Sequence, residues 1–238
     1  MQMHLLAHAL LAHISLCRTS PARSRAAQAV PEYIAGSLMA DFFTGQQIEQ
    51  YPPAVGQAIR QHRAIDDFTD THPEFIRLRQ HIADSGAPRF SSGILADIFW
   101  GHSLAAGWDE FAEPLCGLSL PQFCRLVADG ITATRSVHSP AFAHAAGWMV
   151  AHNWLERLSR RSGILQSLQG LSRRLTRAES LPDSIAILDT DARAIHAGFR
   201  RFWPEAVEFA MNWPHESDAQ HTGSVRPVWP RTERYRHL

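Results

Sequence analysis

The chain has 238 residues, of which 45% are hydrophobic and 19% are charged, which is enough apolar material for the core of one domain. Its 23 basic and 23 acidic residues cancel, which excludes the strongly basic overall surface typical of nucleic-acid binding. All 23 basic residues are arginine, and the lack of lysine excludes Schiff-base chemistry and a P-loop.

The cysteines and the first segment bear on where the protein acts. Cys17, Cys116 and Cys124 form no CxxC pair, which argues against a disulfide framework or a thiolate zinc site and favours the cytoplasm. Residues 5–17 are apolar, and residues 27–29 resemble a signal-peptide cleavage site. However, no arginine precedes the apolar stretch, histidines interrupt it, and it is too short to span a membrane. We therefore expect an amphipathic first helix and no membrane span.

Helical periodicity dominates the sequence, and no segment shows a convincing pair of alternating strands. Pro31, Pro53 and Pro73 can each occupy the first turn of a helix, where the missing N–H is tolerated. In chain order, we expect helices over residues 3–16, 31–41, 53–70, 73–85, 93–106, 120–136, 140–161, 164–178 and 183–211.

Two segments fall outside this helical pattern. Residues 18–30 are small and basic, and they are typical of an insertion loop. Residues 213–238 are polar, contain three prolines and are expected to form a loose, disordered tail. The remainder, residues 1–212, is predicted to be one all-α domain of about eight to nine helices.

The densest group of potential metal ligands lies between His62 and Asp70. On a helix, His62, Asp66 and Asp70 follow one another at intervals of four residues, so they lie on one face. An imidazole and two carboxylates in one stripe suit a divalent metal ion. The same spacing is also common on solvated helix faces, so this stripe alone leaves both interpretations open.

Other predicted helices carry polar residues in apolar surroundings. His4 and His8 are four residues apart in the first helix, and Asp41 and Asp97 each lie within a nearly continuous apolar segment. An ionised carboxylate is costly there unless it is paired or bound to a metal. His102 follows Asp97 by five residues, which is about 140° around a helix. The two side chains therefore do not share a face closely, and one of them would contact a metal ligand instead of the metal ion. Together these residues favour a metal site over isolated, hydrogen-bonded core groups.

Other kinds of site have weaker signals. The sequence contains no Gly-x-Ser-x-Gly and no glycine-rich phosphate loop, and Cys116 and Cys124 are interpreted as small core residues. Six arginines are predicted to lie on the faces of two helices, either as a solvated surface or as a docking patch for an acidic partner or a phosphate. They are Arg157, Arg160, Arg161, Arg173, Arg174 and Arg177.

A series of motifs follows in a fixed order from residue 3 to about residue 210. They are Met3-His4-Leu5-Leu6-Ala7-His8, Gly36-x-Leu38-x-Ala40-Asp41-Phe42, His62-Arg63-x-Ile65-Asp66-x-x-Thr69-Asp70, Asp97-x-x-Trp100-x-His102, Leu188-Asp189-x-Asp191 and Arg201-Phe202-Trp203-Pro204. Their order and most of their spacings resemble the bacterial acyl carrier protein phosphodiesterase family.

The resemblance implies an all-helical hydrolase, distantly similar to the HD-domain metal phosphohydrolases. Such an enzyme removes 4'-phosphopantetheine from holo-acyl carrier protein and leaves the apo-protein, an activity of fatty acid and lipid metabolism. It implies a divalent metal, Mn²⁺ first, with Mg²⁺, Fe²⁺ or Co²⁺ as alternatives. It also implies a small acidic protein as partner, which fits the arginine patch.

These observations lead to a hypothesis of phosphodiester hydrolysis by metal-activated water. Asp70 or His102 would orient the water or protonate the leaving oxygen. Arg63 would hold the phosphoryl oxygens, unless it pairs with Asp67 on the surface. The residues expected to hold one or two metal ions are His8, Asp41, His62, Asp66 and Asp97.

Two other classes of function remain open from the sequence. One is an HD-like phosphohydrolase that uses the same metal site on a nucleotide or a small phosphodiester. The other is a non-catalytic module that binds carrier proteins through the arginine patch. A substrate panel separates the first from carrier hydrolysis, and binding that survives chelation identifies the second.

Overall fold

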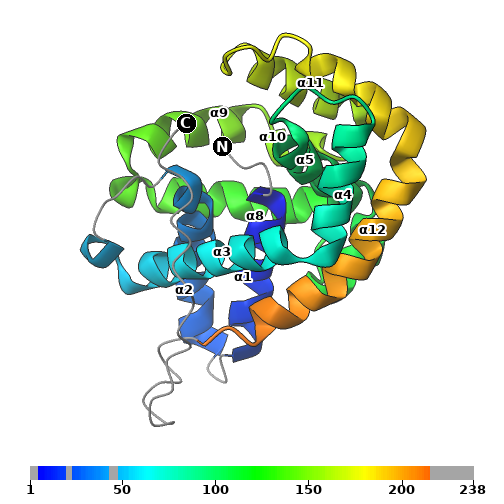
Figure 1. Cartoon of the computed structure of the whole chain (residues 1–238). Helices are drawn as coiled ribbons and strands as arrows, with labels where there is room; N and C mark the ends of the chain where they lie inside the picture. The colour runs from blue at the N-terminus through cyan, green and yellow to red at the C-terminus, as the bar shows by residue number, and fades with distance from the viewer. Residues whose placement is uncertain (1–4, 20–22, 43–47, 215–238) are drawn as a thin grey trace.

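The computed structural model describes residues 5–19, 23–42 and 48–214 (Figure 1). Within these ranges the chain forms twelve α-helices and four short 3₁₀ turns, and it contains no strand. The prediction of an all-α protein is confirmed. The expected number of eight to nine helices is too low for the described chain, because three of the helices are single turns. Hydrophobic periodicity does not reveal a helix of one turn, since the pattern needs several turns to be visible.

The long helices are α1 (Leu5–Thr19), α2 (Arg23–Met39), α3 (Pro53–Thr71), α4 (Pro73–Asp84), α5 (Ser92–Ala106), α8 (Leu120–Ala133), α9 (Pro140–Ala151), α11 (Arg161–Ser172) and α12 (Ile185–Met211). The single-turn helices are α6 (Trp108–Phe111), α7 (Glu113–Cys116) and α10 (Trp154–Arg157). The 3₁₀ turns are η1 (Ala40–Phe42), η2 (Ile48–Gln50), η3 (Arg135–Val137) and η4 (Leu181–Ser184).

Prolines open several of these helices. The starts predicted at Pro53 and Pro73 are confirmed, because proline at the first position has the right backbone angle and lacks only an N–H that would be unpaired there. At the start of α4 the ring of His72 also caps the helix, and its Nδ1 accepts a hydrogen bond from the Glu74 N–H at 3.1 Å.

The prediction of a loop over residues 18–30 is wrong for most of that stretch. Helix α1 continues to Thr19, and α2 already begins at Arg23. The stretch is rich in alanine, the best helix former, and this outweighed its small and basic character. Pro31 therefore lies inside α2 and not in a first turn. From residue 215 onward, the predicted tail lies outside the described residues.

The helix predicted over residues 140–161 is interrupted. Its chain path turns at Asn153, which has a left-handed backbone with φ of 46°, a conformation that asparagine tolerates better than most residues. Helix α11 then starts close against the end of α10, because a Cβ at Gly163 would lie only 2.0 Å from the Arg157 carbonyl oxygen. Helix α11 ends at Ser172, earlier than the predicted residue 178.

Helix α1 is the centre of the core. Almost every residue from Leu5 to Ser15 is buried, because the helix packs against α2, α3, α5 and α12. Helix α12 runs along one side of the molecule (Figure 1). The ring of Trp100 on α5 stacks on Phe202 of α12, with 4.5 Å between centroids, and lies 5.2 Å from Phe75 of α4. None of the described helices is both long and apolar enough to cross a membrane.

Polar contacts fix α12 to the other helices. Both carboxylate oxygens of Glu74 accept hydrogen bonds from Arg201 at 2.9 Å, and this interaction lowers the pKa of Glu74 to about 2. On α3, the buried Gln61 amide donates to Ser15 Oγ at 3.1 Å and to the Ala210 carbonyl at 3.2 Å. Gln61 therefore joins α3 to α1 and α12.

Helices α2 and α3 approach each other closely at Gly36. A Cβ at this position would lie 2.8 Å from both the Cα and the carbonyl oxygen of Val55, and 2.9 Å from the Cβ of Ala58. Because backbone atoms cannot yield as a side chain can, only glycine fits there without moving a helix. The contact sets the distance between the end of α2 and α3.

We predict that Gly36→Ala lowers the free energy of unfolding by roughly 1–3 kcal/mol, because the added methyl group overpacks the α2–α3 contact. Gly147→Ala in α9 is the matched control, since nothing lies within 4 Å of its Cβ position, and alanine there is expected to stabilise by about 0.5–1 kcal/mol. Urea denaturation measures both changes. Equal effects of the two substitutions would contradict the close-packing argument.

Candidate metal centre

Three side chains from α1 and α3 meet in the interior. The rings of His8 and His62 are stacked, with 3.6 Å between centroids and 17° between planes. Asp66 bridges them, because its Oδ1 lies 3.0 Å from His8 Nε2 and its Oδ2 lies 3.2 Å from His62 Nε2. Each residue offers one potential ligand atom, and these atoms all lie within 4.8 Å of one another. The shared face predicted for His62 and Asp66 is confirmed.

The apolar residues around His62 and His8 in the sequence place both histidines on buried helix faces. His62 shares the buried face of α3 with Val55 and Ile59, and it is only 2% exposed. His8 is 3% exposed within the leucine-rich α1, whose whole circumference is covered by other helices. His4, which was expected on the same face of this helix, lies outside the described residues.

Asp41 brings a second carboxylate to the cluster from η1, the short turn that follows α2. Its Oδ1 accepts a hydrogen bond from His62 Nε2 at 3.2 Å. His62 therefore lies between Asp41 and Asp66, and four of the five predicted ligands come together from three segments of the chain. Because η1 directly follows α2, the close contact at Gly36 also sets the position of Asp41 relative to α3.

The charges in the cluster depend on one another. Burial alone would lower the pKa of His62, but the carboxylates of Asp66 and Asp41 outweigh it and raise that pKa to about 10. Burial and the charge of His62 together lower the pKa of His8, against the opposing effect of Asp66. Burial would raise the pKa of Asp66, but the two histidines hold it well below its usual value. The carboxylates of Asp66 and Asp41 thus favour positive charge at His62, and a bound metal ion would supply positive charge at the same place.

The donor set fits a divalent metal ion. Imidazole nitrogens and carboxylate oxygens are ligands that suit Mn²⁺ and related ions. Within the described part of the chain, Asp41 Oδ2 and His62 Nδ1 are buried without a hydrogen-bond partner, although buried polar atoms are normally paired. A cation held by Asp41, Asp66 and a histidine would compensate for the cost of burying these charges.

Asp97 and Asp70 extend the acidic region. Asp97 on α5 is 8% exposed, and burial raises the pKa of its carboxyl well above the usual value. The charges of Asp66, Asp70 and Asp41 raise it further. The pKa of Asp70 is also raised, by burial and then by Asp66. The carboxyl groups on α3, α5 and η1 therefore repel one another when they are ionised, and a cation near them would relieve this repulsion.

Arg79 on α4 is a residue of this region that the sequence analysis missed. Its charge lowers the pKa values of both Asp97 and Asp70, against the effects that raise them. Its Nε lies 3.9 Å from the position of a Cβ on Gly93, and Gly93 precedes Asp97 by one turn of α5. No local motif distinguishes Arg79 from the other exposed arginines, since only the packing of α4 on α5 brings it to the site.

Two predicted catalytic residues, His102 and Arg63, form no hydrogen bond or ion pair with the cluster of histidines and aspartates in the part of the chain that the structure describes. The Nδ1 of His102 donates to the Leu158 carbonyl at 2.7 Å, so this nitrogen is bonded to the segment between α10 and α11. Because a carbonyl only accepts, this bond keeps the proton on Nδ1. Arg63 is exposed on α3, and within the described residues it forms no ion pair with Asp67. The catalytic roles assigned to His102 and Arg63 stay predictions.

The arginine patch differs from the expected pair of helix faces. All six side chains are exposed. The helix break before α11 lies within the first group of three arginines, so they do not share one helix. The second group of three follows the end of α11 at Ser172 and is not helical. They are Arg157, Arg160 and Arg161, and then Arg173, Arg174 and Arg177. Arg161 forms a two-point ion pair with Asp189 of α12, which neutralises its charge. The prediction that each group of three shares a helix face is wrong.

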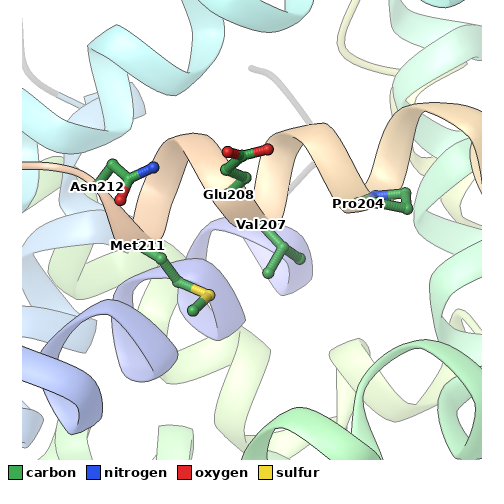
Figure 2. Close-up of a pocket in the computed structure, with 5 residues that line it drawn as sticks. All are labelled: Pro204, Val207, Glu208, Met211 and Asn212. Carbon is green, nitrogen blue, oxygen red and sulfur yellow. The ribbon is translucent and has the colours of Figure 1, made fainter.

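A pocket of about 380 Å³ lies along the C-terminal half of α12 (Figure 2). Its lining consists of Pro204, Val207, Glu208, Met211 and Asn212, which follow one another along the helix. None of the predicted site residues lines it. The cluster of histidines and aspartates is thus separate from this pocket.

We predict that Mn²⁺ stabilises the protein by about 2.7 kcal/mol at a hundredfold excess over its dissociation constant, because it binds only the folded cluster. His62→Ala and the more conservative Asp41→Asn should both abolish binding in calorimetric titration. His81→Ala is the matched control, since this histidine pairs with Asp191 on the surface at 3.0 Å. Wild-type Mn²⁺ affinity in folded His62→Ala and Asp41→Asn would exclude the cluster as the site.

Comparisons with known proteins agree with the resemblance. The family model for acyl carrier protein phosphodiesterase matches residues 3–206. A protein named acyl carrier protein phosphodiesterase from Enterobacter sp. (strain 638) is 28% identical over 210 residues, which cover 88% of this chain and 98% of that relative. Proteins of the same name from Serratia proteamaculans (strain 568) and Photorhabdus laumondii are 30% and 32% identical. Each of these two alignments spans 177 residues and 74% of this chain, with 89% and 87% of the relatives.

No solved structure matches the chain, so its likeness to the HD-domain phosphohydrolases stays a prediction. The family model covers all the residues proposed as metal ligands, from His8 on α1 to Asp97 on α5. The chain therefore belongs to the acyl carrier protein phosphodiesterase family.

Proposed function

We propose that this protein hydrolyses the phosphodiester that joins 4'-phosphopantetheine to a serine of holo-acyl carrier protein. Water adds to phosphorus, the bond from phosphorus to the serine oxygen breaks, and that oxygen takes a proton. The products are apo-carrier protein and 4'-phosphopantetheine. The observation that carries the proposal is the convergence of His8, Asp41, His62 and Asp66 within a chain of this family.

In this proposal the four residues, with Asp97, hold a divalent cation, Mn²⁺ first. When bound, the cation supplies positive charge that polarises the phosphoryl oxygens. Asp66 contacts both histidines, so it fixes the orientation of their rings. Asp70 follows Asp66 by one turn on the same face of α3, where its carboxylate can accept a proton from water or return it to the serine oxygen.

Arg79 supports the proposal from the neighbouring helix. A phosphodiester carries a negative charge, and it would enter a region that already holds the carboxylates of Asp70 and Asp97. The charge of Arg79 acts on both carboxyl groups, and we assign to Arg79 the phosphate-holding role that the sequence pattern indicated for Arg63. Its guanidinium can donate to a non-bridging phosphate oxygen and offset the repulsion.

The test of the function is mass spectrometry of holo-acyl carrier protein after incubation with the protein and Mn²⁺. We expect a loss of about 340 Da, the mass of the arm removed by hydrolysis on the serine side, with metal but not with a chelator. Asp66→Ala should show no conversion while its helical circular dichroism stays unchanged. Near-wild-type turnover by Asp66→Ala at saturating Mn²⁺ would refute the site.

The same experiment separates the two other classes of function. Hydrolysis of nucleotides or small diesters, with holo-carrier protein untouched, would indicate another substrate for the same cluster. Binding of holo-carrier protein that survives chelation, with no apo-protein formed, would indicate a binding module.

We predict that Arg79→Ala lowers kcat for holo-carrier protein by about 10²-fold, because it removes a charged donor to the phosphate. Arg63→Ala is the matched control, since Arg63 is also an exposed arginine and is adjacent to His62 in the sequence. We expect the control to retain kcat within about twofold. Steady-state kinetics on both variants checks this assignment, and the reverse order of effects would return the role to Arg63.

A further inference from the structure

Phe90, in the turn between α4 and α5, is exposed far more than a large apolar side chain usually is. Its side chain is 94% exposed, compared with 51% for Ile76 and 45% for Trp148. Burying a phenylalanine ring stabilises a protein by about 1.5–3 kcal/mol relative to leaving it in water. The ring of Phe90 therefore contributes nothing of this kind to the fold.

The backbone of Phe90 is strained as well. Its φ of 66° lies in the left-handed region, which glycine adopts freely and a bulky side chain seldom does. Strained residues of this kind cluster at sites of function, because the strain has no benefit for the fold itself. The guanidinium of Arg89 lies 5.5 Å from the ring centroid and adds a positive charge next to it.

The turn is connected directly to the metal centre. Phe90 lies two residues before α5, and Asp97 lies in the second turn of that helix. Arg79 lies against the first turns of the same helix at Gly93. On α4, the half-exposed Ile76 precedes Arg79 by three residues, which puts both near one face of that helix. We call Ile76, Arg79 and Phe90 the α4–α5 rim.

The chemistry of the reaction requires a folded protein surface close to the cluster. The bond to be broken joins the prosthetic arm to the oxygen of a serine side chain on the carrier protein. When the phosphorus lies at the cluster, only the serine side chain separates it from the surface of the carrier protein. Apolar and arginine side chains at the rim would then be covered, and aromatic residues and arginine are the types enriched in such contacts.

We propose that the α4–α5 rim is the docking site for the carrier protein and that Phe90 is its anchor, packed against an apolar patch beside the modified serine. This inference rests on the proposed function. It assigns the first contact to the rim rather than to the arginines around α11, where Arg161 is already neutralised by Asp189.

The test is Phe90→Gly, which removes the ring and also relieves the strained backbone. We expect the KM for holo-carrier protein to rise about tenfold, with kcat unchanged, as for the loss of one anchor residue. Hydrolysis of bis(p-nitrophenyl) phosphate with Mn²⁺ should be unaffected, because a small diester lacks the protein surface that Phe90 is proposed to contact. Calorimetry with the chelated protein should show a parallel loss of affinity for holo-carrier protein, and Tm should not fall.

Leu115→Ala is the matched control, because Leu115 is a large apolar residue that is 43% exposed on α7, outside this rim. It should leave KM unchanged. If wild-type protein cleaves the carrier and Phe90→Gly has the same KM, the docking proposal is wrong and the proposed function is unaffected. A fall in Tm and kcat without a change in KM would give Phe90 a structural role and also overturn it. If wild-type protein neither binds nor cleaves the carrier, the proposed function fails and the docking site with it.

Discussion

The structure depends on the burial of charge at one point between α1, η1 and α3. His62 is held between two carboxylates, and Asp66 is held between two histidines, so each ionised group is compensated by another. Removal of one partner leaves a charge uncompensated, which lowers the free energy of unfolding. The packing of α2 on α3 at Gly36 and the burial of α1 among its neighbours both serve to keep these groups within reach of one another.

The parts of this site that the sequence predicts are those governed by local spacing. His62 and Asp66 share a face because a helix places residues four apart on one side, and Asp41 was recognisable as a carboxylate in an apolar segment. Arg79 was missed because its position depends on the packing of two helices, which no local pattern encodes. The break at Asn153 was missed for a related reason, since the flanking segments are both helical and only His152 and Asn153 separate them.

Arginine is the only basic residue of the chain, apart from histidine, and it also holds α12 in place. Arg201 of α12 binds Glu74 of α4 through two parallel hydrogen bonds, and Arg161 of α11 binds Asp189 of α12 in the same manner. A planar guanidinium matches a carboxylate in this geometry and a lysine does not. These pairs orient α12 over the aromatic cluster around Trp100, which in turn supports the helix that carries Asp97.

The hydrogen bond from Gln61 to the Ala210 carbonyl has a consequence for the order of assembly. The two residues are separated by 149 positions, so the contact closes one of the longest loops in the chain. The helix that carries His62 and Asp66 cannot complete its packing until α12 has been synthesised and has folded back onto it. A nascent chain that already contains all five residues proposed as metal ligands therefore still lacks the final support of the cluster, and full organisation of the cluster coincides with completion of the helical domain.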